Sequence, residues 1–164
     1  MLPVVSIVGN SGSGKTTFLE QLIPKVIKRG YKVATIKHDA HNFEIDKPGK
    51  DSWKHRKAGA ETVILSAKNR LAMIRELDTE VGLDDILANY ISEDIDLVIT
   101  EGYKTGDKPK IEIFRPTKFA KPLFDLDDDK VLTIVENKDN SNKLFADEEI
   151  NKVVDLIVQE VIDK

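Results

Sequence analysis

Apolar residues follow two different spacings along the chain, and segments with the two spacings alternate. Short β-branched runs predict strands, whereas apolar residues that recur every three or four positions predict helices. The expected strands cover residues 3–8, 32–37, 62–66, 70–74, 96–100, 110–115 and 131–135. The expected helices cover residues 15–29, 51–58 and 83–91, and a last helix has Asp147 as its N-cap. Strands separated by helices indicate parallel βαβ units, so the predicted class is α/β with a mainly parallel sheet.

Two features interrupt this regular pattern. Pro24 lies inside the first helix and lacks a backbone donor, so we expect a kink or an early end there. Residues 62–74 predict an added β-hairpin that is apolar on both faces. We place Val63, Leu65, Leu71 and Met73 on one face of this hairpin and Ile64, Ala72 and Ile74 on the other. One face can meet the core, and the other then needs a second partner.

Composition narrows the classes of function. The 164 residues include 25 Lys and Arg against 29 Asp and Glu, which gives a net charge of −4, and no cysteine. A net acidic chain argues against nucleic acid or an anionic membrane surface as the main partner. The missing cysteines exclude disulfides, thiolate metal sites and cysteine nucleophiles. Since the chain shows neither a basic leader nor an apolar run of membrane-spanning length, the sequence predicts a cytoplasmic protein.

A glycine-rich segment follows the first strand. Residues 9–16 read GNSGSGKT and match the phosphate-loop pattern G-x-x-x-x-G-K-[ST] between an apolar strand and an amphipathic helix. Glycines let successive N–H groups turn inward, Lys15 supplies charge to the β- and γ-phosphates, and the Thr16 hydroxyl is a ligand for Mg²⁺. The predicted phosphate-binding residues are Gly9, Asn10, Ser11, Gly12, Ser13, Gly14, Lys15, Thr16 and Thr17. We therefore expect one P-loop nucleotide-binding domain over residues 1–164, a P-loop NTPase-type three-layer sandwich with the added β-hairpin.

Acidic residues are expected at the same edge of the sheet, because ligands in open parallel sheets bind beyond the carboxyl ends of the strands. Glu101, which we place directly after strand 96–100, is the candidate catalytic carboxylate and second magnesium ligand. Asp46 and Asp51, in the loop after strand 32–37, are further metal candidates, and Asp51 has the alternative role of N-cap of the next helix. His38 and His41 share this loop and could bind a transition metal, although two loop histidines are more often simply solvated.

The residues that would select the base form an incomplete motif. The sequence after strand 131–135 reads Glu136-Asn137-Lys138-Asp139-Asn140. Guanine-specific switch proteins carry Asn-Lys-x-Asp at such a position, and here the Asp comes one residue early. The sequence therefore leaves guanine and adenine open.

Several segments together closely resemble the MobB family of molybdopterin-guanine dinucleotide biosynthesis adapter proteins. They are GNSGSGKTT, Ile36-Lys37-His38, DKPGKDS at 46–52 and DLVITEGYK at 96–104. The resemblance implies a GTP-binding protein that holds Mg-GTP, hydrolyses it weakly at most and supports a molybdopterin guanylyltransferase, the nucleotidyltransferase that attaches GMP to molybdopterin. It also implies a homodimer built partly through the 62–74 hairpin. Carried over by position, residues 10–17 would bind phosphates, and Thr16 and Glu101 would serve the magnesium.

Two other classes of protein share a phosphate loop. An ATP-dependent small-molecule kinase usually needs an arginine-bearing lid, and this chain has five scattered arginines without a close pair. A metal-delivery GTPase has a similar Lys-Thr-Thr loop, but its cysteine-containing metal motif is missing here. Both classes remain alternatives to the GTP-binding adapter.

Overall fold

The computed structural model describes residues 2–38, 44–138 and 145–164, and the chain divides into two compact units. The sheet unit comprises Met1–His38 and Tyr90–Lys164, and the hairpin unit comprises Asp39–Asn89. The single nucleotide-binding domain over residues 1–164 stays a prediction. In the described part of the chain, no helix combines the length and the apolar composition that crossing a membrane requires.

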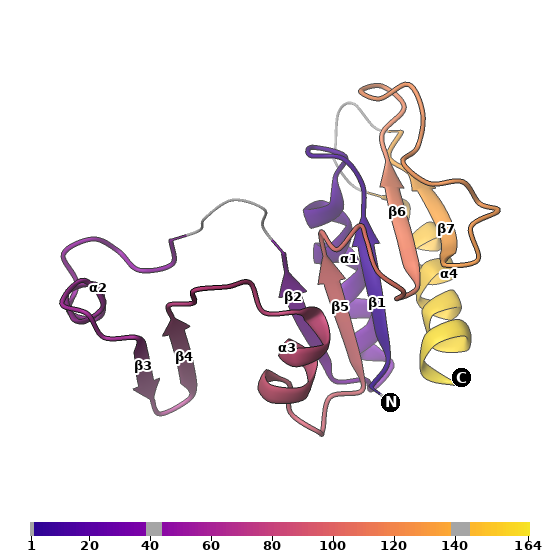
Figure 1. The fold of residues 1–164 in the computed structure, drawn as a ribbon. Coiled ribbons are helices and arrows are strands. Elements are labelled where there is room, and N and C mark those ends of the chain that lie inside the picture. The colour runs from indigo at the N-terminus through magenta and orange to yellow at the C-terminus, as the bar shows by residue number, and fades with distance from the viewer. Residues whose placement is uncertain (1, 39–43, 139–144) are drawn as a thin grey trace. The chain divides into compact units, whose positions relative to one another are not determined.

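Five parallel strands form the centre of the sheet unit. In spatial order they are β2 (Val33–Lys37), β5 (Leu97–Glu101), β1 (Val4–Val8), β6 (Lys110–Phe114) and β7 (Val131–Glu136) (Figure 1). The helices are α1 (Lys15–Lys28) and α4 (Asp147–Ile157), and α4 continues into a π-helical turn over Val158–Ile162. All neighbouring strands pair in parallel, which confirms the predicted α/β class. Each strand and each predicted helix end lies within one residue of its expected bounds.

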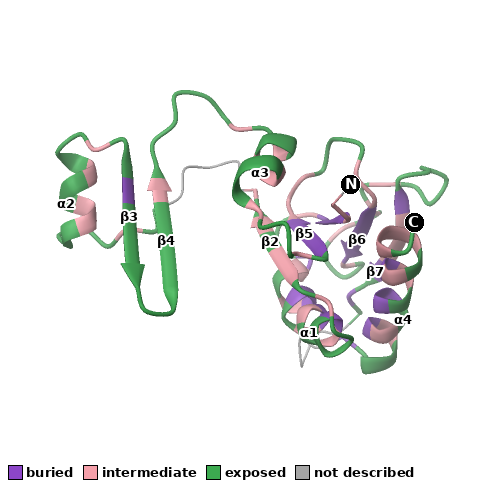
Figure 2. Ribbon diagram, turned by 90° about the horizontal axis from the view of Figure 1, so that it is seen from below, coloured by how far each residue is buried: buried purple, intermediate pink, exposed green. Residues whose placement is uncertain are grey.

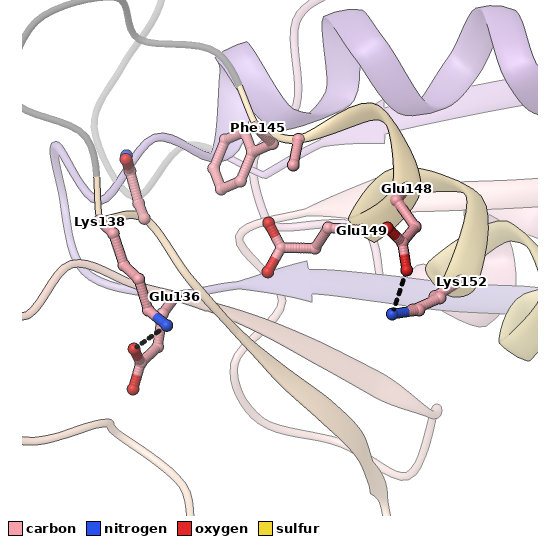
Figure 3. A pocket seen from close by; sticks show the side chains of 8 residues that line it. Glu136, Lys138, Phe145, Glu148, Glu149 and Lys152 are labelled. Atoms are coloured by element: carbon pink, nitrogen blue, oxygen red, sulfur yellow. Dashed lines mark ion pairs between the residues drawn. The ribbon is translucent and has the colours of Figure 1, made fainter.

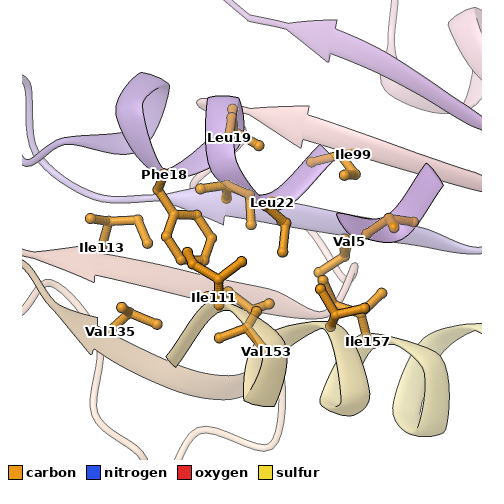
Figure 4. Packing of buried hydrophobic residues seen from close by; sticks show 14 of the residues in the cluster. Val5, Phe18, Leu19, Leu22, Ile99, Ile111, Ile113, Val135, Val153 and Ile157 are labelled. Carbon is orange, nitrogen blue, oxygen red and sulfur yellow. The ribbon is translucent and has the colours of Figure 1, made fainter. Parts of the chain in front are cut away.

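One face of the sheet is apolar and carries both helices. Alternate residues of a strand point to the same face, and the buried residues on this face are all aliphatic in β1, β5 and β6. Phe18 and Leu22 of α1 and Ile150 and Val154 of α4 pack against them, and all four side chains are fully buried (Figure 4). This packing fixes α1 at the end of β1, and so fixes the glycine-rich loop between them.

The opposite face of the sheet carries both apolar and polar buried side chains, and its two buried charged groups bind loops. The buried Lys110 ammonium donates to the carbonyls of Gly106 and Lys108, at 2.9 and 3.1 Å, and so holds the β5–β6 loop. The buried Glu112 carboxylate accepts the backbone N–H groups of Leu123 and Phe124, at 2.8 and 3.0 Å, and so holds the β6–β7 loop. Burial lowers the pKa of Lys110, and the nearby Lys130 lowers it further. These loops form the layer on this face within the sheet unit.

The hairpin unit contains α2 (Asp51–Lys57), β3 (Thr62–Ala67), β4 (Arg70–Arg75) and most of α3 (Leu83–Tyr90). The predicted hairpin is confirmed, and β3 pairs only with β4. Its predicted division into faces is wrong. Ala67 lies opposite Arg70 across a two-residue turn, so Ile64 lies opposite Met73 and shares a face with it. A shift of one residue in loop length moves every side chain of one strand to the other face.

The corrected register places three exposed apolar side chains on one face, while Leu65, 44% exposed, lies on the other face with Val63. Ile64, Leu71 and Met73 now lie together and are 58%, 68% and 41% exposed. On the other face Val63 is buried, and α2 packs against its strand β3. In Figure 2, β3 and β4 are drawn almost entirely as exposed, apart from one buried segment in β3 and the intermediate end of β4. The unpartnered face is therefore a coherent apolar surface.

Three local expectations are corrected by one or a few residues. Of the kink or early end predicted at Pro24, the early end does not occur, because α1 continues to Lys28 with its apolar side held against the sheet and Pro24 exposed. Asp147 is the first residue of α4, and Ala146 is its N-cap. Asp51 is likewise the first residue of α2, so its alternative role as N-cap is wrong by one position.

Candidate phosphate-binding site

The loop between β1 and α1 has a backbone that requires glycine. Gly9 and Gly14 have φ angles of 140° and 107°, which side chains rarely allow. A Cβ atom at Gly9 would also collide with the carbonyl of Ile113 in β6, and one at Gly14 would collide with the amide of Asn137. The predicted loop residues 9–14 therefore curl tightly over the ends of the central strands.

Lys15 places an ammonium at the centre of this curl. Its Nζ donates to the carbonyls of Gly9 and Asn10, both at 3.1 Å, and the side chain is half-buried. The loop carbonyls therefore hold the ammonium of Lys15 in place. Burial lowers the pKa of Lys15, the carboxylate of Glu101 opposes this shift, and the nearby Lys104 and Lys37 add to it.

The loop also has donors that no protein group uses. Ser13 is fully buried, and its hydroxyl finds no hydrogen-bond partner within the described ranges. At the N-cap, Gly14 contributes no side-chain hydrogen bond to α1, so the first N–H groups of the helix lack a side-chain cap. Thr16 and Thr17 stand in this first turn, and Thr16 is exposed. A phosphate chain fits such a cradle, because it brings the acceptors that these donors lack.

Glu101 lies beside the phosphate loop, as predicted from topology. It is the last residue of β5 instead of the first residue after it, and it pairs with Ile7 of β1 and Lys37 of β2. It shares the parity of Leu97 and Ile99, so its side chain points to the face that carries α1. Its effect on the pKa of Lys15 shows that the two charges interact.

Thr16 and Glu101 offer two oxygen ligands for Mg²⁺ at this edge of the sheet. In the ranges that the structure describes, no group of three or more histidine and acidic side chains gathers as a metal centre. Mg²⁺ is commonly held by one or two protein oxygens together with substrate phosphates and water. The residues present therefore fit a magnesium ion that arrives with a phosphate ligand.

The two other metal candidates lie in the hairpin unit and have partners there. One Asp46 carboxylate oxygen accepts the Ser52 hydroxyl at 2.7 Å, and the other lies 3.4 Å from Arg56 Nε. This ion pair is too poorly aligned to count as a hydrogen bond, and Arg56 is bound better by Glu76, at 2.8 Å. Asp51 is exposed and lies 3.4 Å from Lys54 Nζ. Their role at the metal stays a prediction.

His38 is held by the sheet unit at the end of β2. Its backbone N–H donates to the carbonyl of Glu101 at 2.8 Å, and its ring lies 4.7 Å from the ring of Tyr103. Gly102, with φ 103°, passes so close to His38 that a Cβ there would strike the His38 carbonyl. His41, the other predicted metal ligand, and Asp139 of the base motif lie outside the described residues.

Two residues that the sequence did not assign to this site contact the phosphate loop. Lys118, in the β6–β7 loop, donates from Nζ to the Ser11 carbonyl at 3.3 Å. Asn137, directly after β7, donates from Nδ2 to the Ser13 carbonyl at 2.8 Å and is 9% exposed. The order of the strands could have identified both residues, because β6 lies beside β1 and β7 beside β6. This order depends on contacts between residues that are far apart in the sequence.

The comparisons with known proteins agree with this geometry. A family model described as "Molybdopterin guanine dinucleotide synthesis protein B" (MobB) matches residues 4–137. The chain belongs to the MobB family. The predicted family resemblance is thereby confirmed, and the matched residues include the whole phosphate loop, Glu101 and Asn137.

Curated relatives support the same membership. The molybdopterin-guanine dinucleotide biosynthesis adapter protein of Haemophilus influenzae is 43% identical over 136 residues, which are 83% of this chain and 75% of the relative. Its Escherichia coli counterpart is 41% identical over 117 residues, which are 70% and 67% of the two chains. The crystal structure of Bacillus subtilis MobB matches with a TM-score of 0.74 over 99% of this chain and 100% of that one, and at 24% identity it supports the fold. As a MobB member, the protein is an adapter of molybdopterin-guanine dinucleotide biosynthesis.

Proposed function

We propose that the chain binds Mg-GTP at residues 9–17 and, in that state, supports the guanylyltransferase that attaches GMP to molybdopterin. The observation that carries the proposal is the cradle itself, where a half-buried ammonium and an unpartnered buried hydroxyl meet an uncapped helix start. Such a group of donors is matched by the oxygens of a phosphate chain.

Local charge supports the same ligand on a chain that is acidic as a whole. Three further lysines, Lys37, Lys104 and Lys118, lie near the loop and its Lys15. Glu101 is the acidic group that acts on Lys15 in the opposite sense. A triphosphate with Mg²⁺ would neutralise this excess of positive charge. Glu101, whose charge acts on Lys15 in the free protein, would then also interact with the metal ion.

The chemistry available at the site is modest. A bound Mg²⁺ would neutralise charge on the β- and γ-phosphate oxygens. Lys15 would hold the same oxygens, and Glu101 would orient water next to them. The arginines that speed phosphoryl transfer in efficient enzymes are not among the residues placed at this loop. We therefore propose slow GTP hydrolysis, at a rate suited to a binding protein.

We further propose that two copies of the chain associate through the hairpin. Its exposed face of Ile64, Leu71 and Met73 is apolar and continuous across both strands. A two-stranded hairpin is marginally stable in water by itself, so a partner that covers this face would also stabilise the strands.

The proposal is tested by equilibrium titration of the protein with GTP and with ATP in the presence of Mg²⁺. We expect tighter binding of GTP, and we expect Lys15→Ala to weaken it by about 100-fold, because a charge-assisted contact is worth up to roughly 3 kcal/mol. Lys28→Ala, at the exposed last turn of the same helix, is the matched control and should bind as the wild type does. Clear preference for ATP, or binding that survives Lys15→Ala unchanged, would contradict the proposal.

A further inference from the structure

A cavity of about 440 Å³ lies between the end of β7 and the start of α4. This volume falls in the range of small-ligand sites, roughly 300–1,000 Å³. Its walls include Asn137 and Lys138 from the strand side and Phe145, Glu148 and Glu149 from the helix side (Figure 3). Residues 9–17 of the phosphate loop do not line this cavity.

The cavity adjoins the phosphate loop through a buried side chain. Asn137 lines it and, through the bond from Nδ2 to the Ser13 carbonyl, also contacts the loop. The same amide lies against Gly14, where a Cβ would displace it. A ligand whose phosphates occupy the loop can therefore extend past Asn137 into the cavity.

The aromatic wall of the cavity is fixed to α1. Gln21 donates to the Phe145 carbonyl at 3.0 Å and accepts the Phe145 N–H at 2.9 Å. The Phe145 ring also meets Phe18 edge to face, with ring centroids 5.1 Å apart. Because α1 starts at the phosphate loop, the loop and the aromatic wall belong to one packed assembly.

The carboxylates of the cavity differ in their engagement. Glu148 is paired with Lys152 at 2.7 Å, and Glu136 is paired with Lys138 at 3.4 Å. Glu149 is half-buried, and among the described residues its carboxylate makes no ion pair or hydrogen bond, although its charge helps Glu148 to raise the pKa of Lys152. In Figure 3 its carboxylate points away from the Glu148–Lys152 pair and into the space below Phe145.

We infer that this cavity binds the guanine base of the nucleotide, with Glu149 as the acceptor for the base's own donors. Guanine presents N1–H and the 2-amino group on one edge, and a carboxylate accepts both hydrogens. Adenine presents an unprotonated N1 at the corresponding position, which a carboxylate repels. Phe145, which is 6% exposed, and the aliphatic stem of Lys138 both line the cavity and provide apolar surface next to the base.

The inference rests on the proposed function, since it places the base of a triphosphate that the loop holds. It also accounts for the incomplete Asn-Lys-x-Asp motif. Asn137 and Lys138 match its first two residues, and Glu149 of α4 would replace the carboxylate of its Asp. The site thus gives a chemical reason for choosing guanine over adenine.

The test uses the whole chain and compares Glu149→Gln with Asp155→Asn by equilibrium titration. Glu149→Gln should weaken GTP binding at least about tenfold and should improve binding of xanthosine triphosphate, because the new amide can donate to the 2-oxo group of xanthine. Asp155→Asn, on the same helix but outside the cavity and paired with Arg29 at 2.6 Å, should leave both affinities within about twofold of the wild type.

A second measurement needs no variant. Inosine triphosphate lacks the 2-amino group, so the wild-type protein should bind it about tenfold more weakly than GTP. Equal binding of inosine triphosphate and GTP, or unchanged GTP binding in Glu149→Gln, would overturn the inference and leave the phosphate site standing. A wild-type protein that binds neither GTP nor ATP would overturn the proposed function and the inference with it.

Discussion

The two units of the chain differ in how they hold their shape. In the sheet unit, β1, β5 and β6 are buried almost throughout, and α1 and α4 share one apolar core with them. In the hairpin unit, Val63 is the sole buried apolar side chain among the described residues, while several large apolar residues are exposed, three of them on one face of the hairpin. The sheet unit can therefore support a rigid site by itself, whereas the hairpin unit has a very small core and a large exposed apolar area.

The difference teaches where each part of the function belongs. A phosphate cradle requires backbone atoms held to within fractions of an ångström, which a close-packed core provides. An association surface requires exposed apolar area, which the hairpin provides. We expect substitutions in one unit to leave the property of the other unit intact.

The largest expected effect is on stability and comes from the core. Ile111→Ala, at a fully buried position of β6, should lower the free energy of unfolding by about 3 kcal/mol. Leu71→Ala, at a position that is 68% exposed in β4, should lower it by less than about 0.5 kcal/mol at protein concentrations where the chain is monomeric. Chemical denaturation followed by circular dichroism measures both, and similar losses would remove the contrast between the units.

The next effect is on catalysis in the sheet unit. Glu101→Gln should slow GTP hydrolysis by roughly 100-fold, the usual contribution of a group that positions or activates water. GTP affinity should change by less than about threefold, since Lys15 and the loop amides remain. Single-turnover hydrolysis and equilibrium binding separate these two quantities, with Glu20→Gln on the exposed side of α1 as the matched control. If hydrolysis proceeds at the wild-type rate, Glu101 has no part in it.

A smaller effect is expected on association of the hairpin unit. Ile64→Lys should weaken dimer formation by about tenfold or more, because it places a charge in the middle of the apolar face opposite Met73. Leu77→Lys removes a similarly exposed apolar residue outside the two strands and is the control. Analytical ultracentrifugation reports the dimer, and GTP titration of the same variants should give wild-type affinity. A dimer that tolerates Ile64→Lys must use another surface.

The smallest effect is a pH dependence at Lys15. Burial holds its pKa in the free protein below the ordinary value of 10.5, so affinity for inorganic triphosphate should begin to fall before pH reaches 10.5. Binding in that range should take up protons, because the anion raises the pKa again. The free energy of unfolding should rise with pH over the same range, whereas the affinity falls. The reason is that Lys15 has a lower pKa in the folded protein, so the unfolded chain binds more protons there.

Calorimetry in buffers of different ionisation enthalpy measures the proton uptake. Lys118→Ala should weaken the binding of triphosphate but keep the same dependence on pH, because Lys15 is unchanged. A flat profile in the wild-type protein would show that Lys15 does not control the affinity.

The sequence was informative wherever the determinants are local. Glycine spacing located the phosphate loop, and alternating periodicities gave the order of strands and helices, because both depend on a few neighbouring residues. The hairpin faces were assigned wrongly because they depend on whether the turn has two residues or three. Lys118 and Asn137 were not assigned to the phosphate site because their contacts depend on strand order, which joins residues more than 100 positions apart.

The paired bonds between Gln21 and Phe145 fix the distance between the phosphate loop and the proposed base cavity. Gln21 stands less than two helical turns beyond Lys15, so one stretch of α1 sets the separation between the Lys15 ammonium and the Phe145 side of the cavity. Both residues are carried by one continuous helix, so their spacing depends on the number of residues between them. Inserting one residue between positions 15 and 21 would rotate Gln21 by about 100° relative to Lys15, and a nucleotide could then no longer reach the loop and the cavity at the same time.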